Sequence, residues 1–177
     1  MFPIRPELEY RGLARFYERA EKVQAWDAEA FLEPEPAVSA WSAAEQLFHV
    51  GLANELALRN VQGLLDGRGR MIRPFESITD LAVDVLERGR YPRGESEAPR
   101  TVRPPKRVDP AILADILAGN RTALERLQPR LGEILDAPDV VPHHELGDLS
   151  AAQWLRFARM HAMHHFLIVR DIARARA

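Results

Sequence analysis

The sequence contains no cysteine, and this absence excludes several kinds of chemistry at once. The chain cannot form disulfides, cannot offer thiolate ligands to a metal and cannot use a cysteine nucleophile. The lack of cysteine does not decide the compartment, because it is compatible with a reducing or an oxidising one.

Long apolar runs are missing as well. No apolar segment reaches about 18 residues, so we expect no transmembrane helix. The first residues, Met1 to Pro6, lack the apolar run of a signal peptide, and we therefore expect a cytoplasmic protein. The formal net charge is only −2, which gives no overall field that would attract nucleic acid or a membrane surface.

The composition that remains is that of an ordinary globular domain. The 177 residues are 46% apolar and 28% charged, which suffices for one domain with a substantial core. We therefore expect residues 1–177 to form a single domain. No segment alternates apolar and polar residues as a strand would, so the predicted fold class is all-α.

Five helices are predicted from apolar periodicity and capping residues. Two of them begin alike, because Ser42 with Glu45 and Ser150 with Gln153 match the capping-box pattern. The predicted helices run from Pro6 to about Phe31, from Ser42 to about Leu65, from Thr79 to Arg88, from Asp109 to about Pro129, and from Ser150 to Ala177. The longest loops are predicted at 89–108 and 136–149, where Pro and Gly break the helical periodicity. We expect a bundle of four long helices with one short helix and a long Pro-rich loop.

The last predicted helix carries two histidines in its core-facing seam. The seam residues are spaced by three or four positions: Trp154, Ala158, His161, His165, Ile168 and Ile172. Residues four apart lie one turn apart on the same face, where two imidazoles can bind one metal ion. Burying two imidazoles costs free energy unless they find partners.

His49 on the second predicted helix also faces the core, because it lies over Leu52, Ala53 and Leu56. Antiparallel packing would place His49 near residues 164–168, and parallel packing near residue 157, so the antiparallel arrangement brings the three histidines together better. Three imidazoles with open positions form a catalytic type of divalent metal site. Zinc is the default ion, and nickel, iron and manganese remain open.

Two motifs resemble the signatures of DinB/YfiT-like proteins: Trp41-Ser42-x-x-Glu45-x-x-x-His49 and His161-x-x-x-His165. The segment from His143 to Trp154 is also similar to a run before the last helix in some members. The resemblance covers nearly the whole chain. It implies a four-helix bundle of up-down-down-up topology with His49, His161 and His165 as metal ligands.

The resemblance also implies a function. Some members look like metal-dependent transferases or isomerases that use low-molecular-weight thiols, so we expect a metal-dependent transferase or hydrolase acting on a small molecule. Many relatives carry a Gln three residues after the last ligand, where this chain has Ile168. A partner that orients a metal ligand is therefore either missing or supplied from elsewhere in the chain.

Other polar residues have two interpretations each. Glu45 lies one turn before His49 and is either a helix cap alone or also a base or ligand partner. Asn120 either orients a ligand histidine or satisfies a loop, and His164 faces another helix or a partner subunit. Two further histidines are expected in the loop at the mouth of the bundle: His143 and His144. No catalytic residue beyond Glu45 is predicted.

The segment 88–107 contains seven basic and two acidic residues, a net charge of 7 − 2 = +5. It is either a solvated loop or a site for an anionic substrate or nucleic acid. We favour the solvated loop, because Tyr91 is the only aromatic residue among these charges.

Two functional hypotheses remain. In a metal-dependent enzyme, the ion would act as a Lewis acid or lower the pKa of a bound water or thiol. The alternative is a non-catalytic metal-binding or stress-response helical bundle. Bound metal is expected under both hypotheses, whereas an open coordination position lined by a pocket would favour the enzyme. The sequence does not decide between a monomer and a homodimer.

Overall fold

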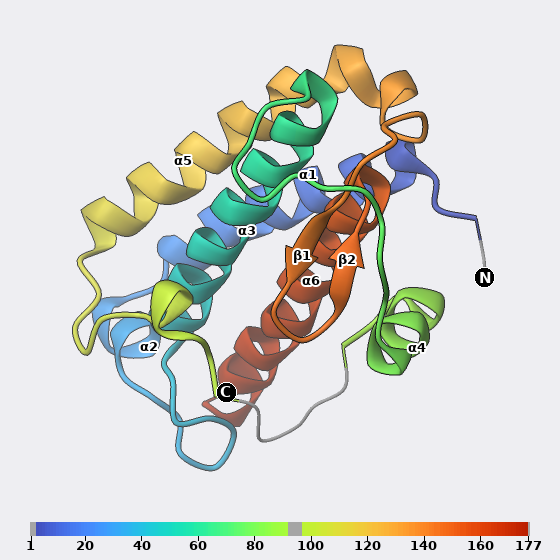
Figure 1. Ribbon diagram of the computed structural model, residues 1–177. Coiled ribbons are helices and arrows are strands. Elements are labelled where there is room, and N and C mark those ends of the chain that lie inside the picture. The colour runs from blue at the N-terminus through green and yellow to red at the C-terminus, as the bar shows by residue number, and fades with distance from the viewer. Residues whose placement is uncertain (1–2, 92–96, 177) are drawn as a thin grey trace.

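The computed structural model describes residues 3–91 and 97–176, and helices dominate this part of the chain (Figure 1). The α-helices in these ranges are α1 (Pro6–Gln24), α2 (Ala28–Leu32), α3 (Ala43–Asp66), α4 (Asp80–Arg88), α5 (Pro110–Leu127) and α6 (Ala151–Ala175). Two 3₁₀ helices, η1 (Arg100–Val102) and η2 (Gln128–Glu133), and two short strands, β1 (Val141–His143) and β2 (Gly147–Leu149), complete the described elements. The predicted helical class is therefore correct.

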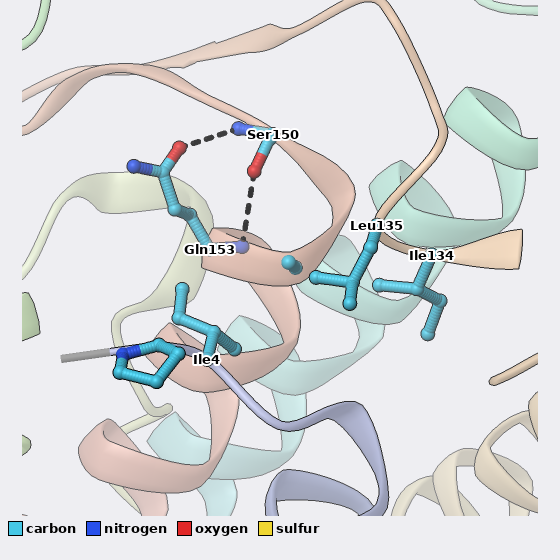
Figure 2. A pocket seen from close by; sticks show the side chains of 7 residues that line it. Ile4, Ile134, Leu135, Ser150 and Gln153 are labelled. Carbon is cyan, nitrogen blue, oxygen red and sulfur yellow. Dashed lines mark hydrogen bonds between the residues drawn. The ribbon is translucent and has the colours of Figure 1, made fainter. Parts of the chain in front are cut away.

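Both predicted capping boxes are present. At the start of α6, the Ser150 amide donates to Gln153 Oε1 at 2.8 Å, and the Gln153 amide donates to Ser150 Oγ at 3.3 Å (Figure 2). The reciprocal bonds of Ser42 and Glu45 begin α3 in the same way. Gly67 ends α3 at φ 61°, a left-handed conformation that glycine adopts without a steric penalty.

Two expectations about secondary structure were wrong. The helix predicted from Pro6 to Phe31 is interrupted, because the Asp27 carboxylate accepts a hydrogen bond from the Ala30 amide at 2.9 Å and starts the separate helix α2. The loop predicted for 136–149 contains the β1–β2 hairpin, in which Val141 pairs with Leu149 and His143 with Gly147. These three-residue strands are too short to show alternation in sequence.

The two longest helices, α3 and α6, pack against each other. Helix α1 packs against α6, α5 and α3, and α5 packs against α3 and α1. Figure 1 shows α3 and α6 running in opposite directions. The Arg176 guanidinium at the end of α6 donates to the carbonyls of Glu33 and Pro34, which precede α3. Antiparallel packing of these helices was the arrangement favoured by the histidine spacing.

The Pro-rich loop is irregular in its described part, 97–108, apart from the single 3₁₀ turn η1. Residues 92–96, which include Arg93 and Glu95 of the charged segment, lie outside the described residues. The interpretation of the whole loop as solvated was wrong in one respect. Val102 is only 8% exposed and belongs to the turn that contacts α3.

No helix within 3–91 or 97–176 is both long and apolar enough to cross a membrane.

An ion pair between α1 and α6 is buried in this packing. Arg156 Nη1 donates to Glu9 Oε1 at 2.9 Å, and these residues are 9% and 4% exposed. Arg156 Nε also donates to the carbonyl of Leu86 at 2.6 Å, and Arg159 pairs with the second Glu9 oxygen. One carboxylate thus fixes two guanidinium groups between α1, α4 and α6.

Replacing Glu9 by Gln should destabilise the fold, because the buried Arg156 and the partly buried Arg159 would both lose their compensating charge. We expect the free energy of unfolding, measured in urea, to fall by about 3 kcal/mol. The matched control is Glu7→Gln, an exposed change in the same turn of α1 that should alter stability by less than about 0.5 kcal/mol. Equal effects of the two substitutions would contradict a stabilising role for the ion pair.

Candidate metal centre

The antiparallel helices α3 and α6 bring His49, His161 and His165 together. One ligand nitrogen from each residue lies within 4.8 Å of those of the other two. The Nε2 atom of His161 is 3.1 Å from the Nε2 atoms of both His49 and His165. The predicted convergence of the three rings is therefore observed in the structure.

Hydrogen bonds on the far side of two rings define their tautomers. His49 Nδ1 lies 2.8 Å from the carbonyl oxygen of Val102, and His165 Nδ1 lies 2.5 Å from Gln46 Oε1. Both oxygens are acceptors, so each Nδ1 carries the hydrogen and donates it. In a neutral imidazole the opposite nitrogen then keeps its lone pair. The Nε2 atoms of His49 and His165 therefore point lone pairs into the cluster.

His161 has no corresponding outer partner. Its Nδ1 is buried without a hydrogen-bond partner among the described residues. Its ring stacks on Phe157 instead, with centroids 5.3 Å apart and an interplanar angle of 17°. If its hydrogen sits on Nε2, only one of the two neighbouring lone pairs can be satisfied well. If it sits on Nδ1, three lone pairs face one another.

The electrostatics of the cluster oppose protonation. Burial is the main cause that lowers the pKa of all three imidazoles, and for His161 and His165 it lowers the pKa well below the usual value. Neighbouring imidazoles lower the pKa values further, while the Val102 carbonyl partly offsets this effect at His49. The rings are therefore held in the neutral form that binds metal ions.

The donor set fits a divalent cation. Three imidazoles around one tetrahedral ion, with bonds of about 2.0–2.1 Å, would place their nitrogens about 3.4 Å apart. The two measured Nε2 separations of 3.1 Å are close to that value. A cation would accept all three lone pairs, which hydrogen bonding within the cluster cannot satisfy together.

The other polar residues singled out in the sequence lie outside the set of three candidate ligands. The Glu45 carboxylate accepts from the Ser42 amide at 2.8 Å and serves as a helix cap. Asn120 Nδ2 donates to the Gly51 carbonyl at 2.7 Å, so it satisfies the backbone of α3 and does not orient a histidine. His164 lies at the edge of the cluster, with its ring 4.9 Å from that of His165.

The loop histidines lie in the hairpin. His143 Nδ1 accepts from the amides of Glu145 and Leu146 at 3.2 and 3.3 Å, and its ring packs 4.7 Å from Phe157. Burial, assisted by His144, lowers the pKa of His143 to about 4. His143 therefore stabilises the turn, and the His144 ring stacks on it at 4.4 Å.

Two contributors to the cluster were not predicted from the sequence. Gln46 could have been recognised, because a buried glutamine one turn before a core histidine on the same helix is in reach of the same partners. The Val102 contribution comes from a main-chain carbonyl 53 residues away from His49, and no side-chain pattern indicates it.

A groove beside the cluster runs between the end of α4 and one flank of α6. Its volume is about 370 Å³. The lining residues are Asp84, Arg88, Gly89, Arg90, Tyr91, Met160, Met163, His164 and Leu167. The Tyr91 ring lies 6.3 Å from that of His161, and its hydroxyl donates to Glu145 Oε2 at 2.8 Å. Tyr91 thus lines the groove and also contacts the ring of His161.

A second pocket, lined in part by Ile4, Ile134 and Leu135, lies beside the α6 cap (Figure 2). The cap is about 16 Å along α6 from His161. The described lining of this pocket includes no ionisable side chain. The groove next to Tyr91 is therefore the better candidate for a ligand associated with the imidazoles.

These features define a class: a predominantly helical protein in which two long antiparallel helices hold three neutral imidazoles around one point. Comparison with protein families identifies the particular group. A model described as the DinB superfamily matches residues 10–169, and the chain belongs to that superfamily. Searches of curated proteins and of solved structures found no match.

The lowered pKa values predict how stability responds to acid. Below about pH 6.5 the unfolded chain binds protons at these histidines while the folded chain resists them, so acid favours unfolding. In the presence of chelator, we expect the free energy of unfolding to fall as the pH drops from about 7.5 to about 5.5.

Urea unfolding at both pH values provides the measurement. His161→Leu is the comparison variant. Its loss of stability between the two pH values should be smaller, because the variant lacks one imidazole whose pKa is lowered by folding. Equal pH dependence of the two proteins would contradict the lowered pKa assigned to His161.

Proposed function

We propose that this DinB superfamily member binds one divalent metal ion through the Nε2 atoms of His49, His161 and His165 and is a metal-dependent enzyme. The observation that carries the proposal is the convergence of three neutral imidazoles, in which His161 Nε2 lies 3.1 Å from the Nε2 atoms of both His49 and His165. Zinc is the ion we expect, with nickel, iron and manganese as alternatives that the same nitrogen ligands accept.

The proposal includes the fold in its finer form, a four-helix bundle of α1, α3, α5 and α6 with up-down-down-up topology. Mutual packing of these helices supports it, as does the antiparallel direction of α3 and α6 (Figure 1). In this arrangement the imidazoles lie on the inward faces of the two central helices, where bundles commonly build metal sites.

Three protein ligands leave coordination positions for a substrate or water, as in catalytic zinc sites. A bound ion there would supply Lewis acidity or lower the pKa of a coordinated water or thiol. The chain itself holds the imidazoles in position. Trp41 and Phe157 pack their rings 5.2 and 5.3 Å from those of His49 and His161.

The groove beside Tyr91 supports a small-molecule substrate. Its volume of about 370 Å³ lies within the range of small-ligand sites. His164 and Tyr91 line the groove, and both also make ring contacts with the candidate ligands. The reaction we infer is a transfer or hydrolysis on a small molecule, with a low-molecular-weight thiol as the cosubstrate implied by the family resemblance.

The second candidate is a metal-binding protein without catalytic activity. It is favoured by the position of Glu45, the one base expected from the sequence. Its carboxylate caps α3 through the Ser42 amide, so it is not poised as a free base at the cluster. The two candidates differ in whether an external ligand reaches the metal.

Metal should stabilise the folded chain without being required for folding, because α3 and α6 also bury long apolar faces. In chelator we expect cooperative unfolding of a helical protein, and added zinc should raise the Tm. His161→Ala and His161→Leu should abolish the zinc-dependent rise while remaining helical, and Leu should be the more stable of the two in chelator.

Thermal unfolding by circular dichroism, with chelator and with zinc, is the measurement. His144→Ala is the matched control, since it removes an exposed imidazole away from the cluster and should keep the full zinc effect. A wild type that is unfolded in chelator would show a structural metal. An equal zinc shift in wild type and in both His161 variants would exclude His161 as a ligand.

Access to the metal separates the enzyme from the non-catalytic alternative. In cobalt-substituted protein, azide should change the visible absorption spectrum of the metal, because an exchangeable position accepts the anion. An unchanged spectrum at saturating azide would indicate a closed site and would favour the non-catalytic candidate.

A further inference from the structure

Gln46 is a buried polar residue to which neither the sequence motifs nor the proposed ligand set gives a role. It is 2% exposed and lies one helical turn before His49 on α3. Its Oε1 atom accepts from His165 Nδ1 at 2.5 Å, across the interface between α3 and α6. Because a buried amide is costly unless it is hydrogen-bonded, this contact calls for a functional or structural reason.

The other end of the Gln46 amide is held as well. Gln46 Nε2 donates to Ser39 Oγ at 2.9 Å, and the same oxygen accepts from the Trp41 amide at 3.0 Å. Ser39 lies in the turn before α3 and is fixed by that backbone contact. In this arrangement the amide nitrogen of Gln46 faces Ser39 and its oxygen faces His165.

The orientation of this amide decides the tautomer of His165. When Oε1 faces the ring, Nδ1 must carry the hydrogen, and Nε2 is free to bind a cation. In the reverse orientation, the amide NH₂ would donate to Nδ1 and move the hydrogen to Nε2, where it would block coordination. Gln46 thus supplies His165 with the polar outer partner that the apolar side chain of Ile168 cannot provide.

We propose that Gln46 is a positioning residue of the metal centre, which holds His165 in the tautomer that binds metal. The inference rests on the proposed function, because it presupposes that the three imidazoles bind a cation. Within residues 3–91 and 97–176, His49 has the Val102 carbonyl as its outer partner and His161 has none, so Gln46 is the one described side chain that fixes a ligand tautomer.

Two substitutions separate this role from simple core packing. Gln46→Met keeps the size of the side chain and removes the hydrogen-bond acceptor. Gln46→Glu keeps an acceptor, because both oxygens of a carboxylate accept and its rotation presents no donor to His165, and it adds a buried charge. If Gln46 only fills space, Met should preserve the centre best and Glu should harm it most. If Gln46 positions His165, the order of metal affinities is the opposite.

The experiment measures zinc affinity by competition with a chromophoric chelator, together with the absorption spectrum of the cobalt-loaded protein. We expect Gln46→Met to weaken zinc binding about 10- to 100-fold and Gln46→Glu to bind zinc at least as tightly as the wild type. Unfolding in chelator should show the reverse order, with the Glu variant the least stable because of its buried carboxylate. Gln46→Leu provides a second acceptor-free variant if the Met variant does not fold.

Asn54→Leu is the matched control, because Asn54 is a buried amide on the same helix that donates to the Tyr17 hydroxyl and not to a histidine. Its zinc affinity should equal that of the wild type. Wild-type affinity in the Met and Leu variants, or tighter binding by Met than by Glu, would overturn the positioning role alone. A wild type that binds no zinc would instead overturn the proposed function, and this inference with it.

Discussion

The antiparallel contact between α3 and α6 is the constraint on which the rest of the site depends. It places one histidine of α3 against two histidines of α6, a turn apart, inside a largely apolar core. Burial keeps the three rings neutral, and outer hydrogen bonds turn two of them so that their lone pairs meet. The lone pairs that meet at this interface cannot all find hydrogen-bond donors within it, and a cation would bind them.

The surrounding elements support that contact in different ways. The Glu9–Arg156 ion pair ties α1 to α6, and the η1 turn brings the Val102 carbonyl to His49. The Pro-rich loop is therefore part of the centre through its main chain, although many of its side chains are charged. On the other flank, Tyr91 links the groove to the hairpin through Glu145. The site is assembled from segments spread over most of the chain.

Helix boundaries and ligand positions could be predicted from the sequence where local rules apply. The Ser42 and Ser150 capping boxes mark the starts of the two central helices, and seam spacing identifies the inward face that carries His161 and His165. The break before α2 was missed because Asp27 competes as a helix cap within an otherwise helical pattern. The Val102 carbonyl could not be predicted, since a main-chain contact leaves no mark on composition or periodicity.

X-ray absorption spectroscopy of zinc-loaded, tag-free protein tests the central claim most directly. The account predicts one zinc ion per chain with three imidazole nitrogens at about 2.0–2.1 Å and at least one further oxygen ligand from water. Fewer than three imidazoles in the first coordination shell, or no zinc retained at all, would contradict it.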